Sequence, residues 1–511
     1  MNESLSGGSG GSSPVQALTR RDMLRRTGTA AAAAAGLGLV ACGGSNAGSR
    51  DAKNLQHYVS RPDLTPPKVT LHRVDPGRKL QYLFLGIANS GPGQGGAMIM
   101  DTSGELVWFS PDTGPHQSKL DFQRQVYRGR PVLTWFQGRV VSGGYGEGVA
   151  QIADSSYQIT HTIHAHNGLQ VDEHEFNISP QGTALVSAFH KQPYDLSKLG
   201  GPKRGWLLSG QAQEIDIETG KLLFFWDSLD HVGFDETYLP IQGGHGTKAK
   251  PYDYFHINTI EDAGDGDVLI GARNTWCMYK VSRKTGEIVW QLNGKKTDFT
   301  MAPGSQFYWQ HDTRLHGRDV LTVFDDGYDG VLPKSEKQSR ALILDVDYDR
   351  MLVTLDKEFV HPGKLVLAKA MGNAQMLPGG GMFVGWGTNP YFSEFDADGK
   401  LVLDGVLLKG DPTYRSFIGD WEGHPVELPA AAARHVPGGS VVYATWNGAT
   451  EVASWNVLAG RSRTSMTVVA TAPKKGFETA VKVRSAGPYF AVEPRDTRGH
   501  SLARSRPVTF P

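Results

Sequence analysis

Short runs of alternating apolar and polar residues recur along most of the chain, without the spacing of an amphipathic helix. Five segments share one outline, in which a strand of roughly five residues leads through a Gly- or Asp-centred turn to a second apolar strand. They are residues 96–110, 212–228, 277–294, 341–358 and 392–407, and residues 149–164 have the same outline without the glycine. This pattern predicts many short strands joined by tight turns.

A second pair of apolar runs, again split by a turn, precedes several of these segments. Examples are FNISPQGTALVSAF (176–189), INTIEDAGDGDVLIGA (257–272) and AQMLPGGGMFVGWG (374–387). The repeating unit is therefore four strands, about every 55 residues, over residues 75–410. We predict an all-β fold in which six such units form a six-bladed β-propeller, since stacked blades bury faces that each blade alone would expose. The 63 glycines among 511 residues divide between a linker at the start of the chain and the turns of this repeat.

The remaining segments divide the chain further. Residues 436–511 contain six or seven shorter apolar runs, which predict a small immunoglobulin- or fibronectin-like β-sandwich after the propeller. Residues 411–435 are expected to connect the two domains, and residues 42–74 form a Pro- and Gly-rich tether before the first blade.

The first 41 residues have the features of an export signal. Arg20 and Arg21 are adjacent, as in twin-arginine signals, and the apolar stretch 30–41 that follows is too short to span a bilayer as a helix. The sequence LVAC ends on Cys42, which predicts lipidation of that cysteine and anchoring to the membrane. We expect an exported protein, either a lipoprotein on the outer face of the cytoplasmic membrane or, if the signal is an ordinary one, a secreted protein.

Charge and cysteine content exclude several functions. The 52 basic and 52 acidic side chains balance, and no basic stripe predicts a contact with nucleic acid. Apart from Cys42 the chain has only Cys277, expected to be a buried, inert thiol, so a disulfide framework and a four-thiolate metal site are excluded. Phosphate-binding glycine motifs in a strand–helix context and the GxSxG elbow are absent from the predicted propeller, and we predict no cofactor.

Polar residues at the starts of predicted inner strands are the candidate functional groups. His174 lies in DEHEF, His256 in DYFHINTI and His311 in WQHDTRL, while Arg273 and Asn274 end an inner strand pair in LIGARNTW. If successive blades place equivalent positions around one axis, these side chains face one pocket. Two other interpretations remain open: hydrogen-bonded structural histidines, and a transition-metal site built from three imidazoles, for which no HExxH spacing is present.

The strings DYFHIN, IGARNT, TGEIVWQLNG, QHD, LTVFDDG and SRALILDVD lie in order between residues 253 and 347. In these strings the chain resembles the bacterial arylsulfotransferase family, and more closely its actinobacterial and fungal branch. The likeness extends from SRPDLTPP near residue 60 to TYRSF (413–417) and WNGATEVASW (446–455). It implies a six-bladed propeller whose central histidines carry a sulfuryl group from an aryl sulfate to a phenol, without a nucleotide sulfate donor.

Carried over residue by residue, the resemblance places His256 and His311 at active-site positions and Arg273 in a string that usually reads SRxx. The chain also departs from the family. After FDDG no arginine follows until Arg340, and residues 362–423, where the family's nucleophilic histidine is expected, contain no histidine. We predict His256, His311, Arg273 and His174 as catalytic residues, and Asn274, Asp325, Asp326 and Arg340 as substrate-binding residues.

Two classes of function follow from these residues. The first is an enzyme that transfers a sulfuryl group between a small aromatic sulfate and a phenol, with one of the retained histidines replacing the missing nucleophile. The alternatives are a non-catalytic cell-surface binding propeller that has lost the nucleophile, and a sulfate-ester hydrolase in which water replaces the phenol.

Overall fold

The computed structural model describes residues 54–88, 93–114, 117–141, 144–241, 244–330, 332, 335–408, 413–485 and 487–510. The predicted export signal and Cys42 lie outside these residues. Within them the protein is nearly all β, and helical structure is limited to short segments such as α2 (Ser228–His231). No helix of this part of the chain is long and apolar enough to cross a membrane.

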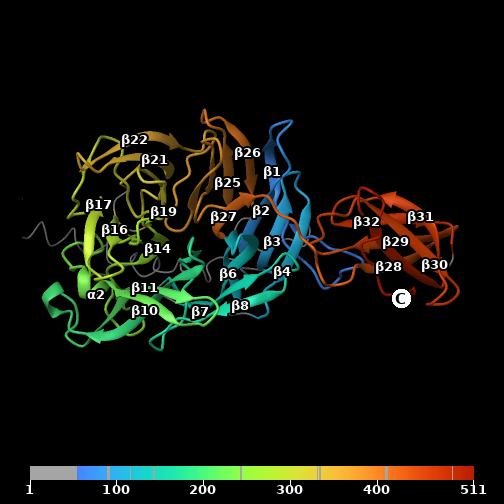
Figure 1. Ribbon diagram of the computed structural model, residues 1–511, viewed down its shortest axis with the longest axis horizontal. Coiled ribbons are helices and arrows are strands. Elements are labelled where there is room, and N and C mark those ends of the chain that lie inside the picture. The colour runs from blue at the N-terminus through green and yellow to red at the C-terminus, as the bar shows by residue number, and fades with distance from the viewer. Residues whose placement is uncertain are drawn as a thin grey trace, which may run out of the picture.

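Six sheets of the described residues contain four or five strands each (Figure 1). The first is β27 (Thr413–Gly419), β2 (Tyr82–Ile87), β3 (Gly96–Asp101) and β4 (Leu106–Pro111). The second is β5 (Ser118–Tyr127), β6 (Arg130–Val141), β7 (Tyr145–Ala153) and β8 (Ile159–Ile163). The third is β9 (Phe176–Ile178), β10 (Thr183–Tyr194), β11 (Gly205–Asp216) and β12 (Leu222–Asp227), with β13 (Tyr252–Asp253) parallel to β11.

The fourth sheet is β14 (Ile257–Asp262), β15 (Val268–Ala272), β16 (Cys277–Val281) and β17 (Ile288–Leu292). The fifth is β19 (His311–His316), β20 (Val320–Asp325), β21 (Arg340–Asp347) and β22 (Leu352–Phe359), with β18 (Thr300–Met301) parallel to β22. The sixth is β23 (Asn373–Met376), β24 (Met382–Gly385), β25 (Tyr391–Phe395), β26 (Leu401–Val406) and β1 (Thr70–Val74).

Turn chemistry explains why the sequence breaks into strands where it does. In the turn between β11 and β12, the carboxylate of Asp216 accepts hydrogen bonds from the backbone N–H groups of Glu218 and Thr219. Gly220 then adopts a φ of +68°, a backbone conformation that side chains with a Cβ rarely adopt. The Asp-to-Gly turns predicted from the sequence are therefore set by local hydrogen bonds.

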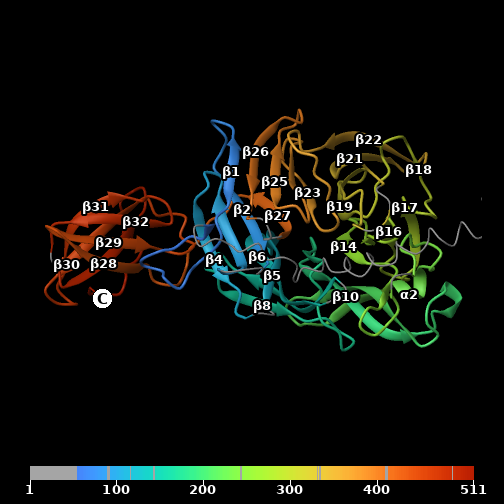
Figure 2. The same cartoon turned by 180° about the vertical axis from the view of Figure 1, so that it is seen from behind.

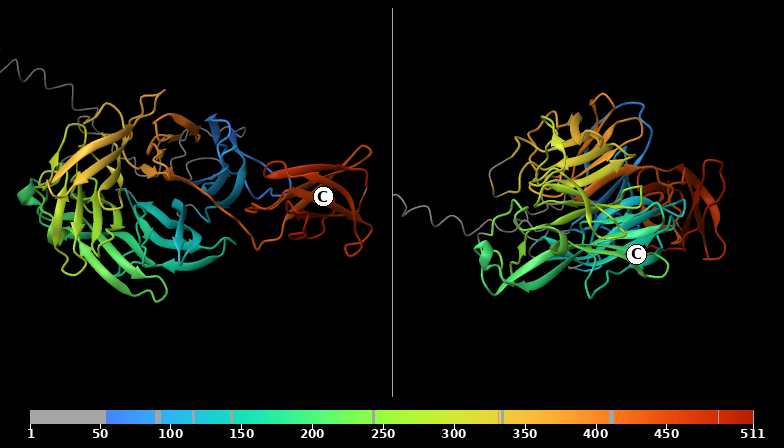
Figure 3. Two further views of the ribbon diagram at one scale, coloured as in Figure 1. Left: turned by 45° about the horizontal axis from the view of Figure 1, so that its top comes forward. Right: turned by 60° about the vertical axis from the view of Figure 1, so that its left-hand side comes forward.

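The six sheets contact one another through their first strands in the cyclic order β27, β5, β9, β14, β19, β23 and back to β27. The left view of Figure 3 shows them following one another around a common centre. Strand β27, which lies in the segment expected to be a connection, pairs with β2, and β1 pairs with β26. The strand that follows the sixth sheet in the chain thus completes the first sheet, and the strand that precedes the first sheet completes the sixth. Buried apolar side chains fill the spaces between neighbouring sheets.

Two three-stranded sheets stand beside this ring (Figure 2). They are β28 (Ala430–Val436), β29 (Gly439–Thr445) and β32 (Glu478–Val483), and β31 (Thr467–Pro473), β30 (Ser454–Gly460) and β33 (Tyr489–Arg495). Asn447 joins this part to the first sheet, because its side chain bonds both the N–H and the C=O of Phe109. Glu478 accepts hydrogen bonds from the backbone and hydroxyl of Ser60.

Candidate functional site

Three histidines, of which His174 and His311 are buried and His256 is partly buried, stand at the same end of three consecutive inner strands. His174 lies two residues before β9, His256 directly precedes β14, and His311 is the first residue of β19. The rings of His174 and His256 meet edge to face, with centroids 4.7 Å apart. The ring of Tyr414 lies 5.4 Å from His174 and 6.3 Å from His311. The fold thus gathers the three histidines around Tyr414, and we call this group the histidine cluster.

Each histidine of the cluster is held by an aspartate on Nδ1. The partners are Asp172 for His174 (2.6 Å), Asp253 for His256 (2.5 Å) and Asp326 for His311 (2.7 Å). A carboxylate on Nδ1 fixes the ring orientation and leaves the lone pair on Nε2.

The Nε2 atoms of the cluster differ in their surroundings. Nε2 of His311 accepts a hydrogen bond from the backbone N–H of Met371 at 3.1 Å. Among the described residues, Nε2 of His174 and Nε2 of His256 have no hydrogen-bond partner. Two histidines therefore carry a lone pair that a substrate atom can use, whereas that of His311 is occupied.

Burial favours the neutral form of two of these rings, those of His256 and His311. It lowers the pKa of His256, an effect that the carboxylate of Asp253 opposes. Burial, together with the positive charge of Arg273, lowers the pKa of His311 well below its ordinary value. A neutral imidazole with its proton on Nδ1 is the form required of a nucleophile or a general base.

His256 is also held in an unusual backbone conformation. Its φ is +57°, in the left-handed region that favours glycine, and Asp253 accepts hydrogen bonds from both its backbone N–H and its ring. Such strain persists only where the surroundings enforce it, and it is common at functional sites.

Arg273 lies beside His256, because its backbone N–H donates to the carbonyl of His256 at 2.9 Å. Its guanidinium stacks over Trp309 at 5.0 Å and donates to the side chain of Asn274 and to the carbonyl of Lys369. Within the described residues its buried Nε has no partner. Burial lowers the pKa of Arg273, and Asp326 opposes this. Arg273 is thus a cation with one unused donor near the histidines.

The other predicted substrate-binding residues divide between the cluster and its scaffold. Asp326 holds His311, and the amide of Asn274 donates to the carbonyl of Asp253. Asp325 and Arg340 instead form an ion pair of 2.9 Å with each other. Asp325 also accepts backbone N–H groups, Arg340 donates to backbone carbonyls, and burial raises the pKa of Asp325 to about 6. These two residues shape the loops of the fifth sheet.

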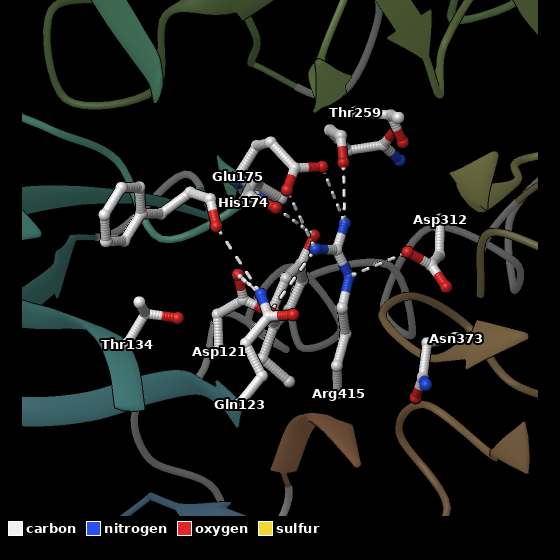
Figure 4. Close-up of polar contacts among 12 residues, drawn as sticks. Asp121, Gln123, Thr134, His174, Glu175, Thr259, Asp312, Asn373 and Arg415 are labelled. Carbon is white, nitrogen blue, oxygen red and sulfur yellow. Dashed lines mark hydrogen bonds and ion pairs between the residues drawn. The ribbon is translucent and has the colours of Figure 1, made fainter. Parts of the chain in front are cut away.

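A second layer of charged residues, absent from the sequence prediction, lies on or beside the inner strands next to His174 (Figure 4). Arg415 is fully buried at its centre and donates to the carbonyl of Asn258 at 2.9 Å. The carboxylates of Asp121, Glu175 and Asp312 lie 3.3 to 3.7 Å from its nitrogens. Burial raises the pKa of Asp121 to about 7, although Arg415 lowers it.

β-bulges place this second layer. The pairing of β5 with β6, β14 with β15, β19 with β20, and β27 with β2 shifts register on the inner strand, next to Asp121, Asn258, Asp312 and Arg415 respectively. A bulge inserts unpaired residues and re-aims their side chains. Equivalent bulges in four sheets therefore direct polar groups to one centre.

Some of these residues had a signal in the sequence. Asp172 and Asp253 stand two and three residues before histidines that were selected, so a search for His–Asp pairs in DEHEF and DYFH would have found them. Arg415 and Tyr414 lie in TYRSF, which was noted only for its resemblance. Nothing in a single sequence indicates that Asp121 and Asp312 meet Arg415, since the contacts cross 294 and 103 residues.

Asp172, Glu173 and His174 are a group of potential metal ligands, with donor atoms within 4.8 Å of one another. Asp172 and His174 already bond each other, and Asp172 accepts the backbone N–H of Gly146. Burial and the neighbouring Asp172 carboxylate raise the pKa of Glu173 well above its ordinary value, which favours the protonated form, a poor metal ligand.

Comparison with known proteins gives one family. The family model described as Arylsulfotransferase (ASST) matches residues 123–407, which contain the three histidines of the cluster and Arg273. No curated protein matches the chain.

Solved structures resemble the chain only distantly. A Bacteroides caccae protein of unknown function has 14% identity and a TM-score of 0.37, covering 66% of this chain and 99% of its own. A virginiamycin B lyase from Staphylococcus aureus has 10% identity and a TM-score of 0.32, covering 64% and 87%. A β-propeller domain of Myceliophthora thermophila Cps50 (Swd1) has 14% identity and a TM-score of 0.31, covering 65% and 98%.

Proposed function

Because the chain belongs to the arylsulfotransferase family, we propose that it transfers a sulfuryl group from an aryl sulfate to a phenol, with His256 as nucleophile. The observation that carries the choice of residue is the state of the His256 ring. Its Nδ1 is bound by Asp253, its Nε2 has no partner among the described residues, and its backbone is held at a φ of +57°. No nucleotide sulfate donor is required.

In the first step the Nε2 lone pair of His256 attacks the sulfur, the bond from sulfur to the aryl oxygen breaks, and the phenol leaves. The leaving oxygen takes a proton from solvent or from protonated His174, whose ring lies against that of His256. Asp253 stabilises the positive charge that develops on the imidazole, and Arg273 stabilises the sulfuryl oxygens.

In the second step the oxygen of the acceptor phenol attacks the same sulfur, and the bond from sulfur to Nε2 breaks. His174 accepts the phenolic proton, and His256 returns to its neutral form. Water in place of the phenol would give hydrolysis. The absence of a histidine in residues 362–423 is compensated in this scheme by His256 itself.

The proposal is tested by incubating the purified protein with 4-nitrophenyl sulfate and a panel of phenols. We expect nitrophenolate release, a sulfated phenol, and a mass gain of one sulfuryl group on the peptide that contains His256. The variant H256A should lose both, while H424A, which removes a half-exposed histidine paired with Glu451, should keep them. Release without a sulfated phenol would identify a hydrolase, and binding without release a non-catalytic protein.

We also propose the finer architecture. The six larger sheets are the blades of one propeller, and the two three-stranded sheets form a β-sandwich. The cyclic order of contacts among the inner strands supports the first assignment, and the shared apolar core of the last residues supports the second. An experimental structure tests both.

We further propose export through a twin-arginine signal and lipidation at Cys42, which would anchor the protein on the outer face of the cytoplasmic membrane. The sequence of residues 20–42 supports this. Metabolic labelling with a fatty acid should mark the wild-type protein and not C42A. Label that persists in C42A would contradict the proposal.

A further inference from the structure

A second cavity, of about 290 Å³, lies at the opposite end of the inner strands from the histidine cluster. His256 directly precedes β14, whereas Glu261, the second-last residue of that strand, lines the cavity. In the same way His311 begins β19 and His316 ends it. Residues on or beside all six inner strands line the cavity, so it lies on the centre around which the sheets are arranged.

The Arg415 layer separates this cavity from the histidines. Glu175 and Asp312, which line the cavity, both contact the buried guanidinium of Arg415. Tyr414 precedes Arg415 in the chain. Its hydroxyl donates a hydrogen bond to the backbone carbonyl of His174, on the side of the histidine cluster. The two sites are therefore distinct.

One wall of the cavity has unused donors. The exposed Arg124 and the amide of Asn177 make no side-chain hydrogen bond or ion pair with the described residues, and Nη1 of Arg314 is buried without a partner among them. Two of the three acids that line the cavity are neutralised by Arg314, and the third, Glu261, makes no ion pair with the described residues. Glu175 and Asp312 each lie 2.8 Å from a nitrogen of Arg314.

Other residues of the cavity lining are apolar. They are Phe84, Met376, Phe417 and Ile418, from β2, β23 and β27. A cavity of about 290 Å³ is at the small end of the range for organic ligands and suits a body of one ring. A ligand that satisfies both kinds of lining carries an anionic group and an apolar surface.

We propose that the second cavity binds a small organic anion, with its anionic group on Arg124 and Arg314 and its ring against Phe84, Met376 and Phe417. No bond is made or broken there. The site is independent of sulfuryl transfer at His256, and its chemistry follows from its own lining residues.

The test uses the full chain and the unreactive probe 4-nitrobenzoate, with binding measured by calorimetry. We expect saturable binding that R124Q weakens about tenfold, as expected for loss of one charged hydrogen bond. The neutral 4-nitrobenzamide should not bind measurably, and inorganic sulfate should bind more weakly than the probe because it lacks the ring. R128Q is the matched control, since Arg128 lies on the turn between β5 and β6 and pairs with Glu218.

The variant H256A distinguishes this site from the histidine cluster. Binding that survives H256A and falls in R124Q supports the second cavity. Binding lost in H256A and unchanged in R124Q would assign the probe to the histidines and overturn the proposal. Equal binding of the neutral amide would overturn it as well. Failure of sulfuryl transfer in the donor assay leaves all these outcomes unaffected.

The binding should also depend on pH. Burial raises the pKa of Glu261 to about 7. The charge of Arg314 and the N–H of Leu315 lower this pKa, and the carboxylates of Glu175 and Asp312 raise it further. Protonation of Glu261 removes a negative charge from the wall, and His316 can gain a positive one only at still lower pH, since burial lowers its pKa. Affinity should therefore rise severalfold from pH 8 to pH 6. Affinity that is constant or falls would contradict an anion at this wall.

Discussion

The backbone N–H of Met371 donates a hydrogen bond to Nε2 of His311 across 3.1 Å, while Nδ1 of that ring lies 2.7 Å from Asp326. Both nitrogens of His311 are thus engaged within the protein. His311 links the loop before β23 to the loop after β20. A covalent role at this residue would first require breaking the bond to Met371.

The first prediction follows from this bond. H311Q should retain the sulfated intermediate on His256, with kcat lowered by about tenfold through misplacement of the neighbouring loops, well below the ~10²- to 10⁴-fold typical of a lost acid–base group. Intact-mass analysis after addition of 4-nitrophenyl sulfate measures the intermediate. If folded H311Q loses the sulfated species and H256Q keeps it, His311 and not His256 is the nucleophile.

The second prediction concerns Asp253, which positions the His256 ring. D253N presents an amide in place of the acceptor for Nδ1–H, so the wrong tautomer becomes populated and kcat should fall by about 10²- to 10⁴-fold. Steady-state kinetics with the aryl sulfate measures this loss. D235N, which alters an exposed aspartate paired with Lys296, should leave kcat unchanged.

The third prediction is the pH profile. Burial lowers the pKa of His256 and Asp253 opposes it, so the wild-type ring is neutral above its ordinary pKa of about 6.5. The ratio kcat/KM should be constant above that pH and fall below it as the ring gains a proton. In D253N the opposing carboxylate is lost, the pKa falls further, and the acid limb should move to lower pH. A limb that moves to higher pH would contradict this assignment.

The fourth prediction concerns Arg273. R273Q removes the cation near the sulfuryl oxygens and should lower kcat/KM by about 10²- to 10³-fold. R273K restores the charge but cannot stack on Trp309 and hold the carbonyl of Lys369 at once, so recovery should be partial. The control is R350Q, which alters an exposed arginine and should leave kcat/KM unchanged. Wild-type kinetics in R273Q would exclude Arg273 from the site.

The fifth prediction concerns stability. R415M removes the cation beside the buried carboxylates of Asp121 and Glu175, so that Asp121 loses its ion pair and Glu175 keeps only the one with Arg314, which should cost about 3–5 kcal/mol. Thermal unfolding should show a midpoint several degrees lower. Adding E175Q removes one of the carboxylates that Arg415 contacts and should recover part of the loss. If the midpoint of R415M equals that of the wild type, Arg415 does not neutralise these carboxylates in the folded protein.

Much of the fold was predictable because its causes are local. The Asp-to-Gly turns, as at Asp216 and Gly220, depend on side chains within four residues, and alternating apolar positions mark the strands. The first strand of the first sheet was not predicted, since β27 lies after the last repeat and acquires its partner only when it pairs with β2 from the other end of this region.

The site was predictable in part for the same reason. His174, His256 and His311 were selected because they occupy equivalent positions before inner strands, and the structure brings them together. The sequence did not distinguish their ring nitrogens. The hydrogen bond from Met371 to His311 joins residues 60 positions apart, and no local pattern encodes it.

The sequence by itself determined an all-β repeat with tight turns, the family strings, and histidines at the starts of inner strands, because short-range hydrogen bonds and periodicity carry that information. Only the tertiary structure decided which ring nitrogens have hydrogen-bond partners, that Arg415 and its carboxylates lie between the histidine cluster and the second cavity, and that four bulges aim polar groups at the centre. Those properties depend on groups far apart in the chain that meet only when the ring of sheets closes.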